Sequence, residues 1–130
     1  MISCIIEVVQ WGDSLQFNNK ELIYLQIVDY IKRQIVLNNY KAMEKIPSVR
    51  EMAARLCVNP NTVLKAYDEL VKNFVIIPKS TNGYFVTDDK IVVEKLRDGF
   101  VNEYINDYLN KMQAIGINKV EAINLLNGGE

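Results

Sequence analysis

Two helix-start signals stand eleven residues apart in the middle of this chain, at Ser48 and Asn59. Glu51 follows Ser48 by three residues, which is the capping-box pattern in which each side chain bonds the backbone N–H of the other residue. Asn59 is a favoured N-cap, and Pro60 follows at the first helical position, where a missing N–H costs nothing. The spacing leaves room only for one short helix and a tight turn, so it predicts a helix-turn-helix.

The second helix of such a pair presents its N-terminal residues outward, where they reach base edges in the major groove. The pattern therefore predicts double-stranded DNA as the partner. The net charge of the whole chain is −1, but the charges are unevenly distributed. Residues 41–82 carry a net charge of +3, whereas residues 83–130 carry −3. A basic middle segment is consistent with local neutralisation of phosphates.

Composition argues against several other classes of function. The hydrophobic content of 49% and charged content of 24% are typical of a globular protein. No apolar run approaches the ~20 residues that span a bilayer, and the N-terminus lacks the features of a signal peptide. We therefore expect a cytoplasmic protein that does not contact membranes.

Enzyme chemistry has little support in the sequence. The 130 residues include no histidine, which removes the commonest general base and the commonest metal ligand. The two cysteines, Cys4 and Cys57, form neither a disulfide framework nor a plausible zinc site. The paired acids Asp88 and Asp89 are typical of a helix start. We expect no enzymatic activity, no cofactor and no metal.

The order of elements around the motif predicts a fold that is mainly α with a small β-hairpin. Apolar residues at three- and four-residue spacing predict an amphipathic helix over residues 22–37. After the second helix of the motif, strands over 75–77 and 84–86 enclose a turn at 79–83 that contains Asn-Gly. Three helices followed by a hairpin make a winged helix-turn-helix, which we assign to residues 15–88.

The core of this domain is expected to form around the second helix of the motif. Tyr67 should face inward, since the helical repeat places it with Val63 and Leu70. Side chains that can close the core against the first helix are Leu70, Val71, Val75, Ile77 and Phe85. Residues 1–14 form an N-terminal extension, with a strand or extended arm over residues 2–9.

The remaining segment, 89–127, is predicted to be helical. A long helix from Lys90 to about Gln113 carries an apolar stripe, and Gly99 would let another backbone come close. Gly116 ends this helix, and Asn118 starts a shorter one. The stripe needs a covering partner, either the DNA-binding domain or another chain. If another chain covers the stripe, residues 89–127 form a dimerisation segment with the interface residues Leu96, Phe100, Tyr104, Tyr108 and Met112.

Several separate blocks of the sequence resemble the GntR family of bacterial transcription regulators. The blocks are IYLQI (23–27), IPSVREMA (46–53), NPNTV (59–63) and GYFV (83–86). The tail, with AIGI at 114–117 followed by EAI at 121–123, is similar to the YtrA-type branch, and the resemblance covers about residues 15–127. It implies a homodimer that binds an inverted-repeat operator, usually as a repressor, with tail helices that serve dimerisation.

The resemblance also implies DNA-binding roles for individual residues. Arg50 matches the family arginine at the start of the second helix, and Asn61 and Thr62 match the polar pair that begins the recognition helix. Lys65 lies one turn further on and suits a contact with a phosphate or a base. Gly83 matches the glycine of the wing motif, with Lys79 beside the tip, whereas Thr81 stands where the family usually has another glycine.

Three further residues have a competing structural explanation. Ser48, Arg55 and Asn59 are weaker DNA-binding candidates. Ser48 and Asn59 also serve as helix caps, and Arg55 could be an ordinary surface arginine.

Two questions about function stay open on the sequence alone. The first is whether a small-molecule effector exists; any such ligand would bind at the dimer interface, lined by Phe100, Tyr104 and Tyr108, but these aromatic residues also suit a plain interface core. The second is whether the chain binds DNA at all. A winged-helix protein-interaction module without DNA affinity is the alternative, motivated by the net acidity and by Thr81.

Overall fold

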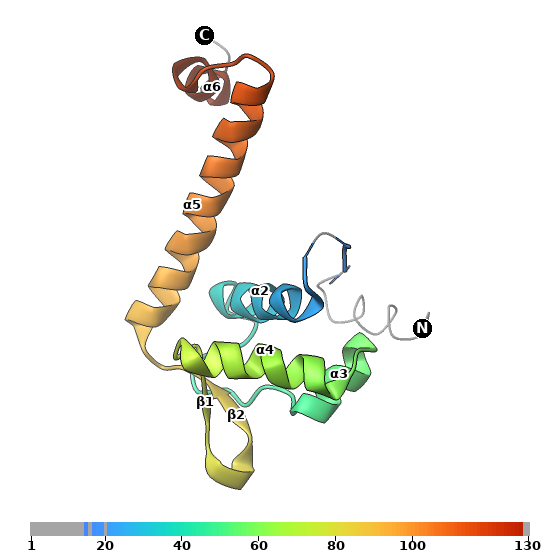
Figure 1. The fold of residues 1–130 in the computed structure, drawn as a ribbon. Coiled ribbons are helices and arrows are strands. Elements are labelled where there is room, and N and C mark those ends of the chain that lie inside the picture. Colours follow the sequence, from blue (N-terminus) through green and yellow to red (C-terminus); the bar gives the residue numbers. More distant parts are fainter. Residues whose placement is uncertain (1–14, 16, 20, 129–130) are drawn as a thin grey trace. The chain divides into compact units, whose positions relative to one another are not determined.

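The computed structural model describes residues 15, 17–19 and 21–128 (Figure 1). The chain divides into two compact units, one that ends at Glu94 and one that begins at Lys95. Within the described residues, the first unit holds three complete helices and a β-hairpin, and the second is helical.

The three helices of the first unit are α2 (Ile23–Val36), α3 (Val49–Leu56) and α4 (Pro60–Lys72). Helix α4 packs against both of the others (Figure 1). Each helix turns one apolar face inward because its large apolar residues recur every three or four positions. Side chains with almost no exposed surface are Ile27, Ile31, Met52, Val63, Tyr67 and Leu70. The predicted first helix and helix-turn-helix are confirmed.

Two short strands follow α4 and form an antiparallel hairpin. Strand β1 (Ile76–Pro78) pairs with β2 (Tyr84–Val86), with Ile77 opposite Phe85. The loop between them contains a 3-10 turn, η1 (Ser80–Asn82), and matches the predicted turn at 79–83. Asn-Gly is not a two-residue turn here, because Gly83 stands directly before β2 and the Lys79 N–H donates to its carbonyl at 2.8 Å.

The core differs from the expectation at the hairpin. Leu70 and Val75 are buried as expected, but Val71, Ile77 and Phe85 are only partly buried. Ile76 is buried instead, at 1% exposure. Successive strand residues face opposite sides, so the face that carries Ile76 packs on the helices and Ile77 faces outward. The predicted strand over residues 2–9 lies outside the described residues.

The second unit contains most of α5 (Lys90–Ala114) and all of α6 (Lys119–Leu126). The start of α5 confirms the interpretation of the paired acids, since the Asp89 carboxylate accepts the Ile91 N–H at 2.9 Å. Asn118 caps α6 by accepting the Glu121 N–H at 2.9 Å. Gly99 has open space around it, because a Cβ built there would meet no atom within 4 Å.

Ser48→Ala is expected to lower the free energy of unfolding of the first unit by about 1 kcal/mol. The capping box is complete: Ser48 Oγ accepts the Glu51 N–H at 3.1 Å, and the Glu51 carboxylate accepts the Ser48 N–H at 3.1 Å. Urea unfolding followed by circular dichroism measures the change. Ser80→Ala, at an exposed turn position without a side-chain cap, is the control and should leave the midpoint unchanged.

Candidate nucleic-acid interface

The turn between α3 and α4 exposes the N-terminal end of α4. Cys57 ends α3 in a left-handed conformation with φ of 55°, and Asn59 begins the next helix two residues later. Asn59 Oδ1 accepts the Asn61 N–H at 2.8 Å, so the first turn is capped. Since the opposite face of α4 is buried, Asn61 and Lys65 project from the unit on an exposed face.

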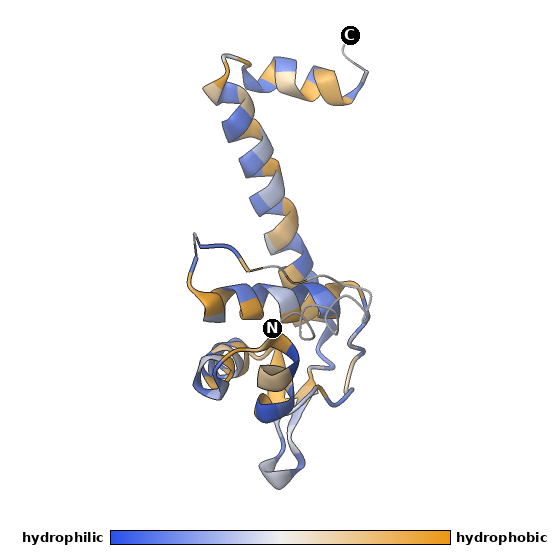
Figure 2. Cartoon of the chain, turned by 90° about the vertical axis from the view of Figure 1, so that its right-hand side faces the viewer, coloured by the Kyte–Doolittle hydropathy of each residue, from blue (hydrophilic) through white to orange (hydrophobic). Residues whose placement is uncertain are grey.

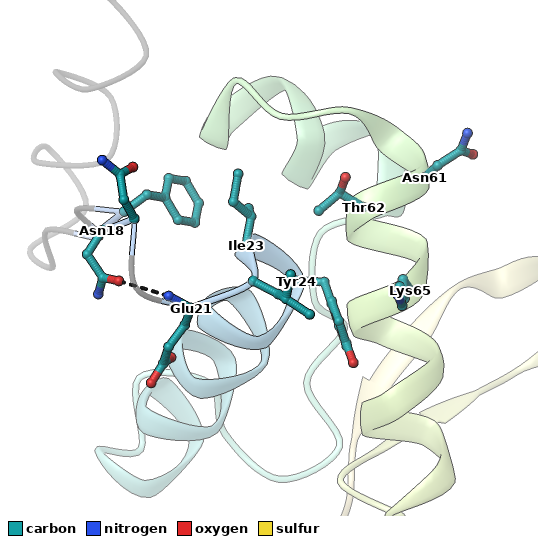
Figure 3. A pocket seen from close by; sticks show the side chains of 10 residues that line it. Asn18, Glu21, Ile23, Tyr24, Asn61, Thr62 and Lys65 are labelled. Atoms are coloured by element: carbon teal, nitrogen blue, oxygen red, sulfur yellow. Dashed lines mark hydrogen bonds between the residues drawn. The ribbon is translucent and has the colours of Figure 1, made fainter.

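The three predicted base-reading residues lie in different environments. The Asn61 side chain is exposed and points away from α2, whereas Thr62 is half-buried and faces the opening beside it (Figure 3). The Lys65 ammonium lies 4.3 Å from the ring centroid of Tyr24 in α2, a cation–π arrangement. The Asn61 side chain is therefore accessible to a partner. The Lys65 ammonium already contacts Tyr24, so a phosphate or base would bind it in competition with, or in addition to, that ring.

A pocket of about 620 Å³ lies between α4 and the segment that precedes α2 (Figure 3). Its lining residues are Phe17, Asn18, Asn19, Glu21, Leu22, Ile23, Tyr24, Asn61, Thr62 and Lys65.

Gln26 fixes the wall of this pocket. Its buried side-chain amide donates to the backbone carbonyls of Asn18 and Glu21, at 3.0 and 2.9 Å, and its Oε1 accepts the Asn18 N–H at 3.0 Å. Sequence reasoning missed this role; the signal was a glutamine on the inward face of the first helix, where an amide needs partners.

Arg50 and Ser48 lie at the start of α3. Arg50 is exposed in the first turn. Ser48 and Asn59 both use their side-chain oxygens as caps, which is the structural explanation considered for them. Hydrogen bonds from the Ser48 backbone and side chain hold the pKa of the Glu51 carboxyl below its ordinary value. A depressed carboxyl pKa contributes stability above the unfolded-state pKa, and this is lost as the pH falls through the folded-state value.

Arg55 lies one turn after Glu51 in α3, half-buried in a polar pocket of about 390 Å³. Tyr40, Glu44, Lys45 and Glu51 line the same pocket. Burial raises the pKa of Tyr40 to about 12, and the positive charge of Arg55 acts in the opposite direction. The environment of Arg55 is that of an arginine held among acidic and phenolic groups of its own chain.

The hairpin of β1, η1 and β2, which we call the wing, carries the last two DNA-binding candidates. The Lys79 ammonium lies 4.9 Å from the ring centroid of Phe85. Gly83 has φ of 100° and ψ of −156°, a conformation that is essentially restricted to glycine. The backbone conformation of the turn is therefore a sufficient reason for glycine at position 83.

The predicted dimer residues are spread along α5. Tyr104 is 53% exposed, and its ring stacks on that of Phe100 with centroids 5.9 Å apart. Tyr108 is partly buried, and its hydroxyl donates to the Ala122 carbonyl of α6 at 2.7 Å. Tyr108 thus joins the two helices, and Leu96, Phe100 and Met112 are also partly buried.

An apolar groove of about 540 Å³ lies between α5 and α6. Its lining includes Ile105, Leu109, Ile123 and Leu126, none of which was predicted as an interface residue. Figure 2 shows apolar residues, coloured orange, along the ribbons of both helices. The available signal was the apolar pattern of the last helix, which includes Val120, Ile123 and Leu126.

Within the described residues, no group of three or more acidic, cysteine or histidine side chains could hold a metal ion. None of the helices described is both long and apolar enough to span a bilayer.

A helix-turn-helix whose second helix exposes its N-terminal end, followed by a wing, defines a winged-helix DNA-binding protein. The family model "Bacterial regulatory proteins, gntR family" matches residues 23–86. The chain is 32% identical over 108 residues to the uncharacterized HTH-type transcriptional regulator YhcF of Bacillus subtilis, covering 83% of this chain and 89% of YhcF. The chain therefore belongs to the gntR family, and it is a transcriptional regulator with a DNA-binding domain.

Two other proteins extend the comparison. A GntR family transcriptional regulator from Listeria monocytogenes is 36% identical with a TM-score of 0.79, and the match covers 88% of this chain and all of that one. The HTH-type transcriptional repressor YtrA of Bacillus subtilis is 37% identical over 67 residues, which is 52% of each chain. The similarity to the Listeria monocytogenes protein includes part of the helical tail, because 88% of this chain is more than the first unit contains.

Proposed function

We propose that this protein is a repressor that binds an inverted-repeat operator as a homodimer. The observation that carries the DNA-binding part is the exposed N-terminal end of α4, held in place by the buried face of the same helix. In a helix-turn-helix this end enters the major groove. The repressor role rests on the similarity to YtrA, which is described as a repressor.

Specific residues take separate roles in this proposal. Asn61 and Thr62 read base edges, because amide and hydroxyl groups form hydrogen bonds with bases in the major groove. Arg50 approaches the same groove from the start of α3. Lys65 and Lys79 contact phosphates, which set the register of the protein on the duplex without reading sequence.

The homodimer is supported by the composition of the second unit. Its described residues bury only one side chain fully, that of Ala122, while large apolar residues of α5 and α6 are exposed. So small a unit cannot bury enough apolar surface alone. A second copy would cover these residues, and the two-fold symmetry of a dimer matches an inverted repeat.

Fluorescence anisotropy tests the proposed function. The probe is a duplex that the wild-type protein selects from a random-sequence library, compared with a scrambled duplex of equal length at several salt concentrations. Tighter binding to the selected duplex, with an affinity that falls steeply as salt rises, would support an operator-binding regulator. Failure to select or bind any duplex at low salt would contradict it and favour the protein-interaction module.

Arg50→Ala is expected to weaken binding to the selected duplex by about 1–3 kcal/mol without unfolding the protein. The exposed side chain has room to contact DNA and contributes nothing to the core. Anisotropy gives the affinity, and circular dichroism checks the fold. Arg97→Ala, an exposed arginine of the second unit, is the matched control. Unchanged affinity in a folded Arg50→Ala protein would remove this residue from the interface.

A further inference from the structure

Lys45 lies beside the wing although it is distant from it in sequence. The segment that connects α2 to α3 runs along the free edge of β2: Lys45 pairs with Phe85 in an antiparallel bridge. The Ile46 N–H donates to the Tyr84 carbonyl at 3.0 Å, and the Val86 N–H donates to the Glu44 carbonyl at 2.9 Å. Lys45 is therefore held in register with the hairpin by backbone hydrogen bonds.

The side chain of Lys45 lies against Gly83. A Cβ at position 83 would lie 2.9 Å from Lys45 Cε and 3.8 Å from its Nζ. The aliphatic part of the Lys45 side chain thus packs against the backbone at the end of the loop, just before β2 begins. Its ammonium lies next to Gly83. The residue is exposed and forms no ion pair with any described residue, although it lines a polar pocket with Glu44 and Glu51 and its charge contributes to the lowered pKa of Glu51. Its ammonium therefore stays open to an anionic partner.

Lys45 and Lys79 consequently both contact Phe85. The Lys79 ammonium lies over the Phe85 ring, and Lys45 pairs with the Phe85 backbone. The tip between the strands, Ser80–Asn82, carries no charge of its own. All positive charge at the wing therefore comes from these two side chains.

We infer that Lys45 is a second phosphate-contacting residue of the wing, which acts with Lys79 to hold the DNA backbone. Phosphate is the anion that suits a lysine on a DNA-binding surface, because the ammonium acts as a point charge without the directional fork of arginine. The inference rests on the proposed DNA binding and adds a residue to it. Since a phosphate contact carries no sequence information, Lys45 should contribute equally on every duplex.

The experiment measures the salt dependence of binding for Lys45→Ala and Lys45→Arg, on the selected and the scrambled duplex. For Lys45→Ala, the slope of log affinity against log salt should become shallower by about 0.9 for each subunit bound. The affinity near 0.1 M salt should fall by roughly five- to ten-fold for each subunit, equally on both duplexes. Lys45→Arg should keep the wild-type slope, because it keeps the charge.

Two controls separate this role from a structural one. Lys72→Ala removes an exposed lysine at the opposite end of α4 from Asn61 and should leave the slope unchanged. Urea unfolding of Lys45→Ala should give the wild-type midpoint. A wild-type slope in Lys45→Ala, with binding still weakened by Arg50→Ala, would overturn the inference while the proposed function stands. Absence of DNA binding by the wild-type protein would overturn both.

Discussion

Replacing Tyr67 with alanine should lower the free energy of unfolding of the first unit by about 3–5 kcal/mol, a large share of the ~5–15 kcal/mol typical of a domain. The Tyr67 side chain has no exposed surface. Its ring meets that of Tyr84 edge to face with centroids 4.9 Å apart. The residue therefore joins the recognition helix to the wing, and its removal leaves a cavity between them.

The hydroxyl of Tyr67 adds a second contribution. It donates a hydrogen bond to the Pro47 carbonyl at 2.6 Å, which fixes the segment just before α3. Tyr67→Phe keeps the packing but leaves this carbonyl without its partner, so it should cost about 1–3 kcal/mol. Burial raises the pKa of Tyr67, so the hydroxyl stays protonated and can donate.

Urea unfolding monitored by circular dichroism measures both changes. Phe74→Ala is the control, because it truncates an aromatic residue that is 72% exposed and should change stability by no more than about 0.5 kcal/mol. If Tyr67→Ala and Phe74→Ala lowered stability equally, Tyr67 would not be the residue that joins the helix to the wing. Equal stability of Tyr67→Phe and wild type would show that the hydrogen bond contributes nothing net.

The features that sequence could predict are local ones. Ser48 with Glu51, Asn59 with Pro60, and Asn118 each identify a helix start because a capping bond joins residues at most three positions apart. The inward face of α4 was also predictable, since helical periodicity fixes which residues share a side.

The features that were missed depend on contacts between distant segments. Lys45 reaches the wing only because its segment pairs with β2, about forty positions later in the chain. The Gln26 side chain forms hydrogen bonds with backbone groups of the loop before α2. Backbone groups are the same in every residue type, so these partners leave no pattern in the sequence. The burial of Ile76 in place of Ile77 reflects a strand of three residues, too short for alternation to reveal its inner face.

The predicted dimer stripe illustrates the same limit. Periodicity placed Tyr104 and Tyr108 on one side of α5, but it could not tell which of them α6 would contact. Tyr108 bonds the backbone of α6, while Tyr104 stays exposed beside the groove. A partner chain would therefore meet Tyr104 and the apolar residues of the groove, with Tyr108 acting within the subunit.

Tyr104→Asp is accordingly expected to convert a dimeric wild-type protein into a monomer. Tyr104 and Ile105 are each about half exposed, at 53% and 50%, and both line the apolar groove. In a two-fold symmetric interface each substitution occurs twice. Two unpaired carboxylates would then lose their hydration on association, at a cost of several kcal/mol. The dimer dissociation constant should rise by at least about a hundred-fold, the equivalent of 2.7 kcal/mol.

Sedimentation velocity over a range of concentrations measures this change. Asn110→Asp adds the same charge to an exposed position on another face of α5 and should leave the protein dimeric. Ile123→Asp tests the α6 side of the groove independently. A monomeric wild-type protein, or a Tyr104→Asp protein that stays dimeric while folded, would contradict the interface.

The DNA-binding behaviour of the Tyr104→Asp protein gives the prediction a second readout. The first unit should be unaffected, so a single half-site should bind with wild-type affinity per subunit. On the full inverted repeat the variant should bind more weakly, because the second recognition helix no longer arrives at the high effective concentration that a dimer provides. A variant with intact half-site binding and weakened full-site binding would place dimerisation in the second unit and sequence reading in the first.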